Sequence, residues 1–129
     1  MKSTNLNLSI LPDMYTVCRL PSKTAIPTWG TASSFYSVTH TSDGLSIVCE
    51  SKAMPASVKA KRNWRMIKVE GPLDFSLTGV LVSIAVPLAN ANISIFSIST
   101  FDTDYILVQD KNFSKAITVL RNSGHTVNL

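Results

Sequence analysis

The sequence contains only two cysteines and two histidines among its 129 residues. Cys18 and Cys49 lie in apolar surroundings without metal-type spacing, so we expect reduced thiols that pack as small hydrophobic side chains. His40 and His125 belong to no metal-ligand motif, and we interpret both as structural residues. The sequence also lacks phosphate-binding glycine motifs and a nucleophile elbow. These absences favour a protein that is not an enzyme and holds no metal and no cofactor.

Long hydrophobic runs are also missing. The longest largely apolar stretch, residues 77–89, covers about 13 residues and contains Pro87, whereas a membrane-crossing helix needs roughly 20. The first residues carry one lysine and no apolar block followed by a cleavage site, which argues against a signal peptide. We therefore expect a cytoplasmic protein that has no membrane partner.

The charge is modest, with a formal net value of +4. Five of the 12 basic residues are clustered, namely Lys59, Lys61, Arg62, Arg65 and Lys68. A nucleic-acid site would spread such residues over a face and add aromatic side chains that stack on bases, but only Trp64 lies among them. We interpret the cluster as a solvated connection between two structural halves and expect no nucleic-acid partner.

The second half of the chain has the clearest secondary-structure pattern. Residues 64–70 alternate as in a strand, and Gly71 and Pro72 then interrupt it. Apolar residues recur at helical spacing from Leu77 to Ala91, which predicts an amphipathic helix whose first amides Asp74 or Ser76 can cap. Pro87 removes the hydrogen bond to the carbonyl of Ser83, so we expect a disturbed last turn.

The remaining elements complete a recognisable order. Residues 93–101 and 103–109 predict a hairpin, residues 111–122 a second helix that stops at Gly124, and residues 125–128 a short strand. The order strand-helix-strand-strand-helix-strand is the split βαβ arrangement of ferredoxin-like folds. We therefore predict an α+β fold with an antiparallel sheet and both helices on one face.

The first half repeats part of this pattern. Residues 37–50 align with residues 97–110 at a shift of 60 without a gap, and residues 6–11 correspond to residues 66–70. We therefore predict two modules in tandem, residues 1–62 and residues 63–129. The first module is degenerate, with a turn or short helix between Pro21 and Ser34 and room for a short helix over residues 53–60.

The segment Gly71–Gln109, GPLDFSLTGVLVSIAVPLANANISIFSISTFDTDYILVQ, resembles an ACT domain, the small-molecule-binding regulatory module of amino-acid metabolism. The resemblance depends on Gly79, on the run PLANANISIF and on STFDTDYILV. More narrowly, the chain is similar to short tandem ACT-domain proteins related to the CASTOR arginine sensors, whose first domain the run FYSVTHTSDGLSIVCES resembles. The resemblance extends from about Leu8 to Val127 and implies two ferredoxin-like modules.

The resemblance also implies a ligand site at an interface between modules. The matching positions are the helix start and the adjacent strand, and we add the neighbouring Ser99; the expected ligand-binding residues are Leu77, Thr78, Gly79, Val80, Ser99, Thr100, Phe101 and Asp104.

These residue types suit an amino acid. Unpaired amides at a helix start attract a carboxylate, and a glycine lets a ligand approach the backbone. Asp104 can meet an ammonium or a basic side chain. Each position also has a simpler interpretation: Asp104 as a hairpin residue, Gly79 as a helix-start glycine, Thr78 as a cap and Phe101 as interface packing. We interpret Asp102 as a turn residue.

Three functions remain open at this stage. The first is a non-catalytic sensor of an amino acid, with a basic one among the candidates, that forms a homodimer and signals to a regulated protein partner. The alternative is a protein-interaction module without a metabolite ligand. The third is a small enzyme, which only the paired acids Asp102 and Asp104 support.

Overall fold

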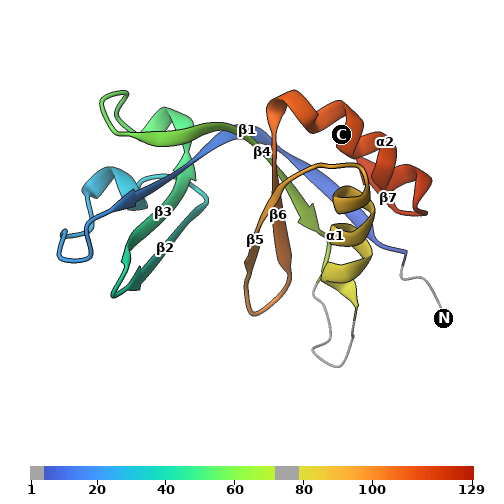
Figure 1. The fold of residues 1–129 in the computed structure, drawn as a ribbon, viewed down its shortest axis with the longest axis horizontal. Coiled ribbons are helices and arrows are strands. Elements are labelled where there is room, and N and C mark those ends of the chain that lie inside the picture. The colour runs from blue at the N-terminus through green and yellow to red at the C-terminus, as the bar shows by residue number, and fades with distance from the viewer. Residues whose placement is uncertain (1–4, 72–78) are drawn as a thin grey trace. The chain divides into compact units, whose positions relative to one another are not determined.

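The computed structural model describes residues 5–71 and 79–129 of the chain, which form two compact units (Figure 1). The N-terminal unit is Asp13–Trp64, and the C-terminal unit combines Arg65–Leu129 with the segment that ends at Pro12. Strand β1 (Asn7–Leu20) and strand β4 (Ala60–Val69) each contribute residues to both units. The predicted modules 1–62 and 63–129 divide the chain at a similar point but assign the start of β1 differently.

The N-terminal unit is built around a three-strand antiparallel arrangement. Strand β3 (Gly44–Glu50) pairs with β1 on one side and with β2 (Tyr36–Thr41) on the other. Two 3₁₀ turns accompany it, η1 (Thr28–Thr31) and η2 (Ser51–Ala53). The first agrees with the turn or short helix predicted before Ser34. The short helix considered over residues 53–60 is absent, because the chain leaves η2 after Ala53 and enters β4 at Ala60.

Cys18 and Cys49 lie in the core of this unit. Both are free and buried, as the sequence predicted, and they pack with Leu45, Ile47 and Met54. Burial raises the pKa of the Cys18 thiol. Burial also raises the pKa of Cys49, and the neighbouring Cys18 and Glu50 add to the effect. These thiols therefore act as small apolar side chains and are poor nucleophiles.

The C-terminal unit contains both helices of the chain's described residues. Its elements are α1 (Val80–Asn90), β5 (Ile95–Ser99), β6 (Asp104–Gln109), the 3₁₀ turn η3 (Asp110–Asn112), α2 (Phe113–Asn122) and β7 (Thr126–Asn128). Every predicted element of this half is present, with ends that differ by a few residues. The residues proposed as caps of the first helix, Asp74 and Ser76, lie outside the described residues.

Strand β1 changes the expected sheet. The path runs β1-β4-β6-β5 in this unit, and β7 pairs with β1 in parallel, through Leu8 and Val127 for example. The sequence predicted an antiparallel sheet made by the second half alone. The structure corrects this, because the start of the chain supplies the strand that β7 needs as a partner.

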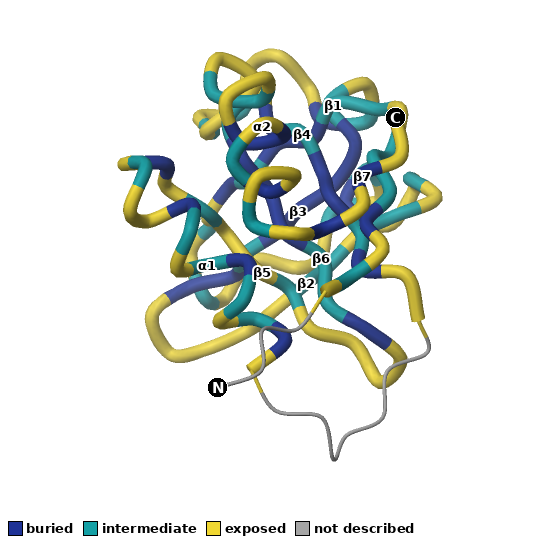
Figure 2. Tube along the Cα trace, turned by 90° about the vertical axis from the view of Figure 1, so that its right-hand side faces the viewer, coloured by how far each residue is buried: buried dark blue, intermediate teal, exposed yellow. Residues whose placement is uncertain are grey.

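Both helices pack on one face of this sheet, as predicted. Buried stretches of the strands and helices are dark blue in Figure 2. The apolar sides of the helices join the strands in one core, which includes Ile67, Val69, Val80, Ile84, Leu88, Ile106, Val108, Ala116, Ile117 and Leu120. Each fully buried aliphatic side chain of this kind contributes about 1.5–3 kcal/mol relative to an exposed one. This packing fixes the position of α1 on the sheet and thereby the position of its first turn.

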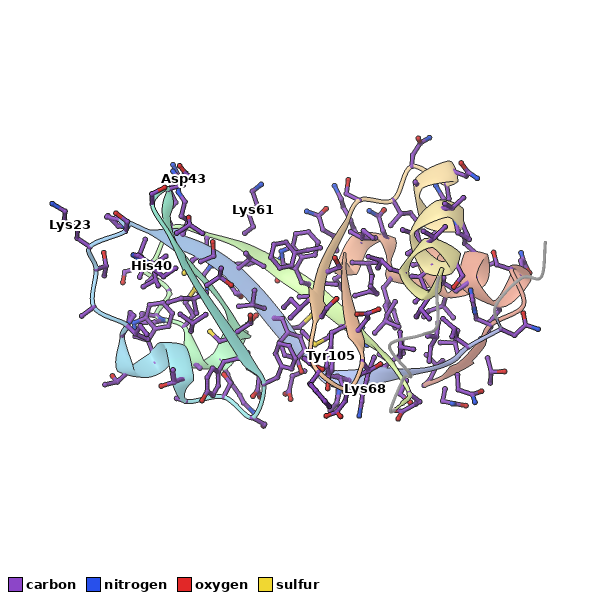
Figure 3. All side chains as sticks on the ribbon, turned by 90° about the horizontal axis from the view of Figure 1, so that it is seen from below. Lys23, His40, Asp43, Lys61, Lys68 and Tyr105 are labelled. Carbon is purple, nitrogen blue, oxygen red and sulfur yellow. The ribbon has the colours of Figure 1, made fainter. Side chains whose placement is uncertain are left out.

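The basic cluster belongs to a strand. Four of its five residues fall within β4, where Arg65 lies 3.9 Å above the ring of Phe113 and 3.4 Å from Asp110. Lys61 points away from the β4 ribbon (Figure 3). The interpretation as a connection between two halves agrees with the structure, because the two units divide within β4, but the segment is a strand that also carries buried apolar residues and is not a solvated linker.

Candidate functional site

Three segments lie at one end of the C-terminal unit: the end of β4, the start of α1 and the turn between β5 and β6. Thr103 in that turn is buried, and its hydroxyl donates a 2.6 Å hydrogen bond to the carbonyl of Val69. Val69 is the last residue of β4, and the chain then leads into α1. Figure 1 shows the start of α1 and the β5–β6 turn at the same, lower end of this unit.

The turn itself is held by Thr100. Its hydroxyl donates to the carbonyl of Thr103 at 3.0 Å and accepts from the amides of Asp102 and Thr103 at 3.3 and 3.2 Å. The Thr100 amide also donates to the Thr103 carbonyl at 2.8 Å. Asp102 is exposed at the tip, which agrees with its interpretation as a turn residue. The predicted ligand residue Thr100 therefore has a structural task in the turn.

Asp104 and Ser99 form a direct pair across the hairpin. The two residues are opposite each other in the β5–β6 register, and the Ser99 hydroxyl donates to Asp104 Oδ1 at 2.6 Å. Asp104 is half-buried. Among the residues that the structure describes, no basic side chain lies within ion-pair distance of its carboxylate. The pair thus presents a negatively charged group beside a strand edge.

Gly79 is the N-cap residue immediately before α1. It has a left-handed backbone conformation with φ 77°, and nothing lies within 4 Å of the place where a Cβ would be. Gly79 is exposed, and because it has no side chain it cannot cap the first amides of the helix; among the described residues, no side chain caps them. This geometry suits a carboxylate that approaches the helix start.

The other predicted site residues differ in their exposure. Val80 is buried in the core, so its side chain is not available to a ligand at the helix start. Phe101 is 81% exposed at the hairpin tip. Leu77 and Thr78 lie outside the described residues.

The outer edge of β5 is a further feature of this end. Strand β5 is the last in the sheet path, and no other described strand pairs with its outer side. No Asp, Glu, Lys, Arg or His occurs from Gly79 to Phe101, although Val82, Val86, Phe96 and Phe101 are exposed. Edge strands of monomeric proteins commonly carry charges or prolines that prevent pairing. The β5 edge lacks both.

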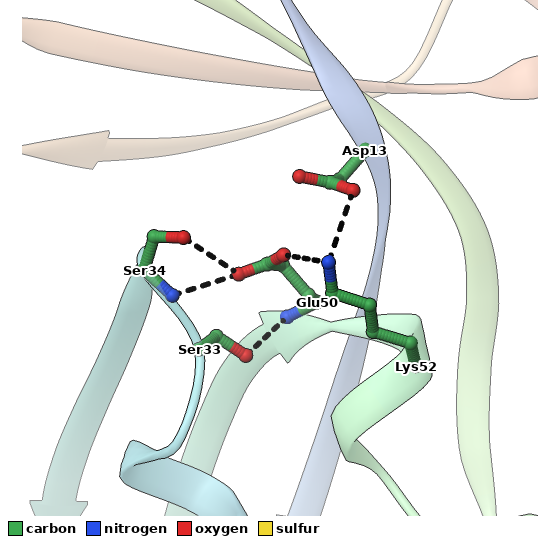
Figure 4. A network of polar contacts seen from close by, with 5 residues as sticks. All are labelled: Asp13, Ser33, Ser34, Glu50 and Lys52. Atoms are coloured by element: carbon green, nitrogen blue, oxygen red, sulfur yellow. Dashed lines mark hydrogen bonds and ion pairs between the residues drawn. The ribbon is translucent and has the colours of Figure 1, made fainter.

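The N-terminal unit contains a second polar cluster, centred on the buried carboxylate of Glu50 (Figure 4). Glu50 is 2% exposed, and its Oε2 accepts hydrogen bonds from the amide and hydroxyl of Ser34 at 2.8 and 3.3 Å. Its Oε1 lies 3.2 Å from Lys52 Nζ, which is also 3.6 Å from Asp13. The Glu50 amide donates to the Ser33 hydroxyl at 3.0 Å.

The protonation of this cluster follows from these contacts. Burial acts to raise the pKa of Glu50, but the hydrogen bonds from Lys52 and Ser34 and the charge of Lys52 outweigh it, so the pKa is lowered. The hydrogen bond to Glu50, with the charges of Asp13 and Glu50, raises the pKa of Lys52. Glu50 therefore stays ionised and joins the end of β3 to the residues that precede β2. Sequence reasoning missed it, because a single acid at a strand end gives no signal.

Two negative findings concern the described part of the chain. No helix there is long and apolar enough to span a membrane. No group of three or more His, Cys, Asp or Glu side chains is arranged there to hold a metal ion.

Comparison with known proteins identifies the class. A model of the ACT domain family matches residues 59–122, and a second model, described as an N-terminal domain, matches residues 13–57. The human protein named cytosolic arginine sensor for mTORC1 subunit 1 is 44% identical over 59 residues. That match covers 45% of this chain but only 18% of the sensor.

Two solved structures extend the comparison to the whole chain. Protein Atu0741 from Agobacterium tumefaciens has a TM-score of 0.93 and 38% identity, covering 98% of this chain and 94% of that one. The regulatory subunit of aspartate kinase from Thermus thermophilus has a TM-score of 0.63 at 10% identity, covering 90% and 96%. The latter likeness concerns the fold alone.

The fold and the matching segment define an α+β protein with an ACT domain. The chain belongs to the same family as Atu0741.

Proposed function

We propose that this protein is a non-catalytic regulatory protein that senses an amino acid. The ACT match over residues 59–122 and the 59-residue similarity to a named arginine sensor support this proposal. The proposal includes two ACT modules in tandem, residues 1–62 and residues 63–129, of which the first is degenerate. It also includes a cytoplasmic location and a protein partner that responds to the bound state.

The proposed site lies at the end of the C-terminal unit described above. The amides of the Gly79 end of α1 bind the ligand carboxylate, and Asp104 binds its ammonium or a basic side chain. Leu77, Thr78, Val80, Ser99, Thr100 and Phe101 complete the expected set. One observation carries the proposal: the Thr103–Val69 hydrogen bond ties the acidic turn to the strand that leads into α1.

A second copy of the chain completes the site in this proposal. The β5 edge is uncharged and free of proline, so an identical edge can pair with it antiparallel without repulsion between like charges. The ligand then lies between the C-terminal modules of the two copies, which is an interface between ACT modules.

Thermal-shift screening with the twenty amino acids tests the function. Ligand at 100 times its dissociation constant stabilises the folded state by about 2.7 kcal/mol, which gives a clear increase in melting temperature. No shift with any amino acid at millimolar concentration would contradict the proposal.

Asp104→Asn tests the site. We expect its affinity for L-arginine or L-lysine, measured calorimetrically, to fall about tenfold or more, since a charge-assisted contact is worth about 1.5–3 kcal/mol. Asp102→Asn is the matched control, because it removes an exposed carboxylate two residues away and should leave affinity unchanged. Equal affinities of the wild type and Asp104→Asn would remove Asp104 from the site.

The unprotected β5 edge also supports a second candidate function, a protein-interaction module without a metabolite ligand. A pull-down with and without each amino acid separates the two functions. A partner whose binding ignores every metabolite favours the interaction module.

A further inference from the structure

We propose that His125 is a positioning residue that holds α1, and with it the Gly79 end of the helix, in a fixed position relative to the start of β1. The ring is buried, with 5% exposure, and it touches backbone groups of two elements that are far apart in the sequence. Its Nδ1 lies 3.1 Å from the amide of Leu6, and its Nε2 lies 2.9 Å from the carbonyl of Ser83.

The two contacts determine where the ring carries its hydrogen. An amide can only donate, so Nδ1 accepts the hydrogen bond from Leu6. The neutral ring then carries its hydrogen on Nε2, which donates to the Ser83 carbonyl. One tautomer therefore satisfies both backbone groups at once.

The Ser83 carbonyl is available because of Pro87. In a regular helix this carbonyl would accept from the amide four residues later, but proline has no amide hydrogen. His125 supplies the missing donor from outside the helix. This contact explains how α1 continues past Pro87 to Asn90, with the Ala91 amide still bonded to the Pro87 carbonyl at 3.2 Å.

The end of α2 fixes the ring in turn. Gly124 has φ 98°, the Gly124 amide donates to Arg121 at 3.0 Å, and the His125 amide donates to Leu120 at 3.1 Å. This is the pattern of a Schellman cap. The next amide, Thr126, donates to the Leu6 carbonyl at 2.9 Å, so both backbone groups of Leu6 are held by His125 and Thr126.

The arrangement joins α1 to β1 through one side chain. Ser83 lies one turn after Gly79, and its own amide donates to the Gly79 carbonyl at 2.9 Å. On the other side, Leu6 immediately precedes β1. A shift of the helix start is thereby passed to β1. The importance of this coupling for ligand binding rests on the proposed function, whereas the coupling itself can be measured without a ligand.

The experiment is amide hydrogen exchange followed by NMR on the full chain, with two variants that each keep one contact. His125→Asn retains an acceptor near the position of Nδ1 and loses the donor to Ser83. His125→Gln retains a donor near the position of Nε2 and loses the acceptor for Leu6. We expect each variant to raise exchange at both α1 and residues 6–10, by about tenfold at the side that loses its hydrogen bond.

The exchange response at the segment whose hydrogen bond is kept distinguishes a positioning residue from two independent contacts. The proposal is overturned if His125→Asn changes exchange only in α1 and His125→Gln changes it only at residues 6–10. In the wild type, ring ¹⁵N shifts should show the hydrogen on Nε2, and a hydrogen on Nδ1 would also overturn the proposal. If the protein binds no amino acid, these exchange results remain unaffected. A failure of the proposed function can therefore be distinguished from a failure of the proposed role of His125.

Discussion

At the scale of single residues, the most informative side chains are the ones that bond to backbone groups. The side chains of Thr103, Glu50 and His125 each bond to a backbone group of a segment that is distant in the sequence. Sequence analysis named Gly79 and Asp104 because they match positions of the family that the chain resembles, and Ser99 because it adjoins them. It missed Thr103, because burial of a turn threonine depends on the strand beside it.

Thr103→Val tests the link between the turn and β4. Valine keeps the shape of threonine but leaves the buried Val69 carbonyl without its donor, so we expect a loss of about 1–3 kcal/mol in unfolding free energy. Thr103→Ser keeps the hydroxyl and serves as the control. Chemical denaturation measures both, and a valine variant at least as stable as the serine variant would contradict the described contact.

Glu50→Gln tests the charge of the buried cluster. Because the folded-state pKa of Glu50 is lowered, its ionised form stabilises the folded state above the unfolded-state pKa of about 4.3, and this contribution is lost as the pH falls through the lowered folded-state value. The wild type should therefore be more stable than Glu50→Gln at neutral pH, and the difference should shrink below about pH 4.3. Denaturation curves from pH 7 to 3 measure it. A difference that stays constant over this range would contradict the assignment.

At the scale of elements, periodicity predicted the strands, helices and hairpin of the C-terminal unit, because each element buries one regular face. The predicted ends of the elements were less accurate, because helix ends depend on local backbone geometry. Gly79, with φ 77°, precedes α1, and Asn92, with φ 60°, follows it. The insertion of β1 beside β7 was beyond sequence reasoning, because strand pairing between distant segments leaves no local pattern. Pro87 was correctly predicted to free the Ser83 carbonyl, and α1 continues to Asn90 with the Ala91 amide within hydrogen-bond distance of both the Pro87 and Leu88 carbonyls.

A double-mutant cycle tests how α1 tolerates Pro87. Pro87→Ala restores an amide that can bond to Ser83, so the loss of the imidazole in His125→Ala should matter less in that background. We expect a coupling of about 1 kcal/mol between the two sites, the worth of one hydrogen bond. Denaturation of the four proteins measures it, and effects that add within about 0.5 kcal/mol would contradict the link.

At the scale of the whole molecule, the feature that calls for explanation is an exposed edge strand without charge. In an antiparallel ladder the backbone groups of successive residues alternate between the two sides. Thr100 bonds inward to Thr103, so Ser99, Ser97 and Ile95 direct their amides and carbonyls outward. An antiparallel partner centred on Ser97 would satisfy these groups.

Ser97→Pro tests the dimer. Proline removes one outward amide without removing a hydrogen bond to β6, so the monomer should fold while dimerisation weakens. Ser97→Ala keeps the amide and is the control. Sedimentation equilibrium should give twice the chain mass for the wild type and the alanine variant, and a lower average mass for the proline variant. A monomeric wild type, or an unchanged proline variant, would contradict pairing through β5.

The central claim is that an amino acid binds at the end of the C-terminal unit that holds the start of α1 and the β5–β6 turn. The most direct measurement is a titration of the ¹⁵N-labelled protein with L-arginine, or with whichever amino acid gives the largest thermal shift, followed by NMR. The account predicts shift changes concentrated at residues 79–83 and 95–104. Changes confined to residues 13–64, or none with any amino acid, would contradict it.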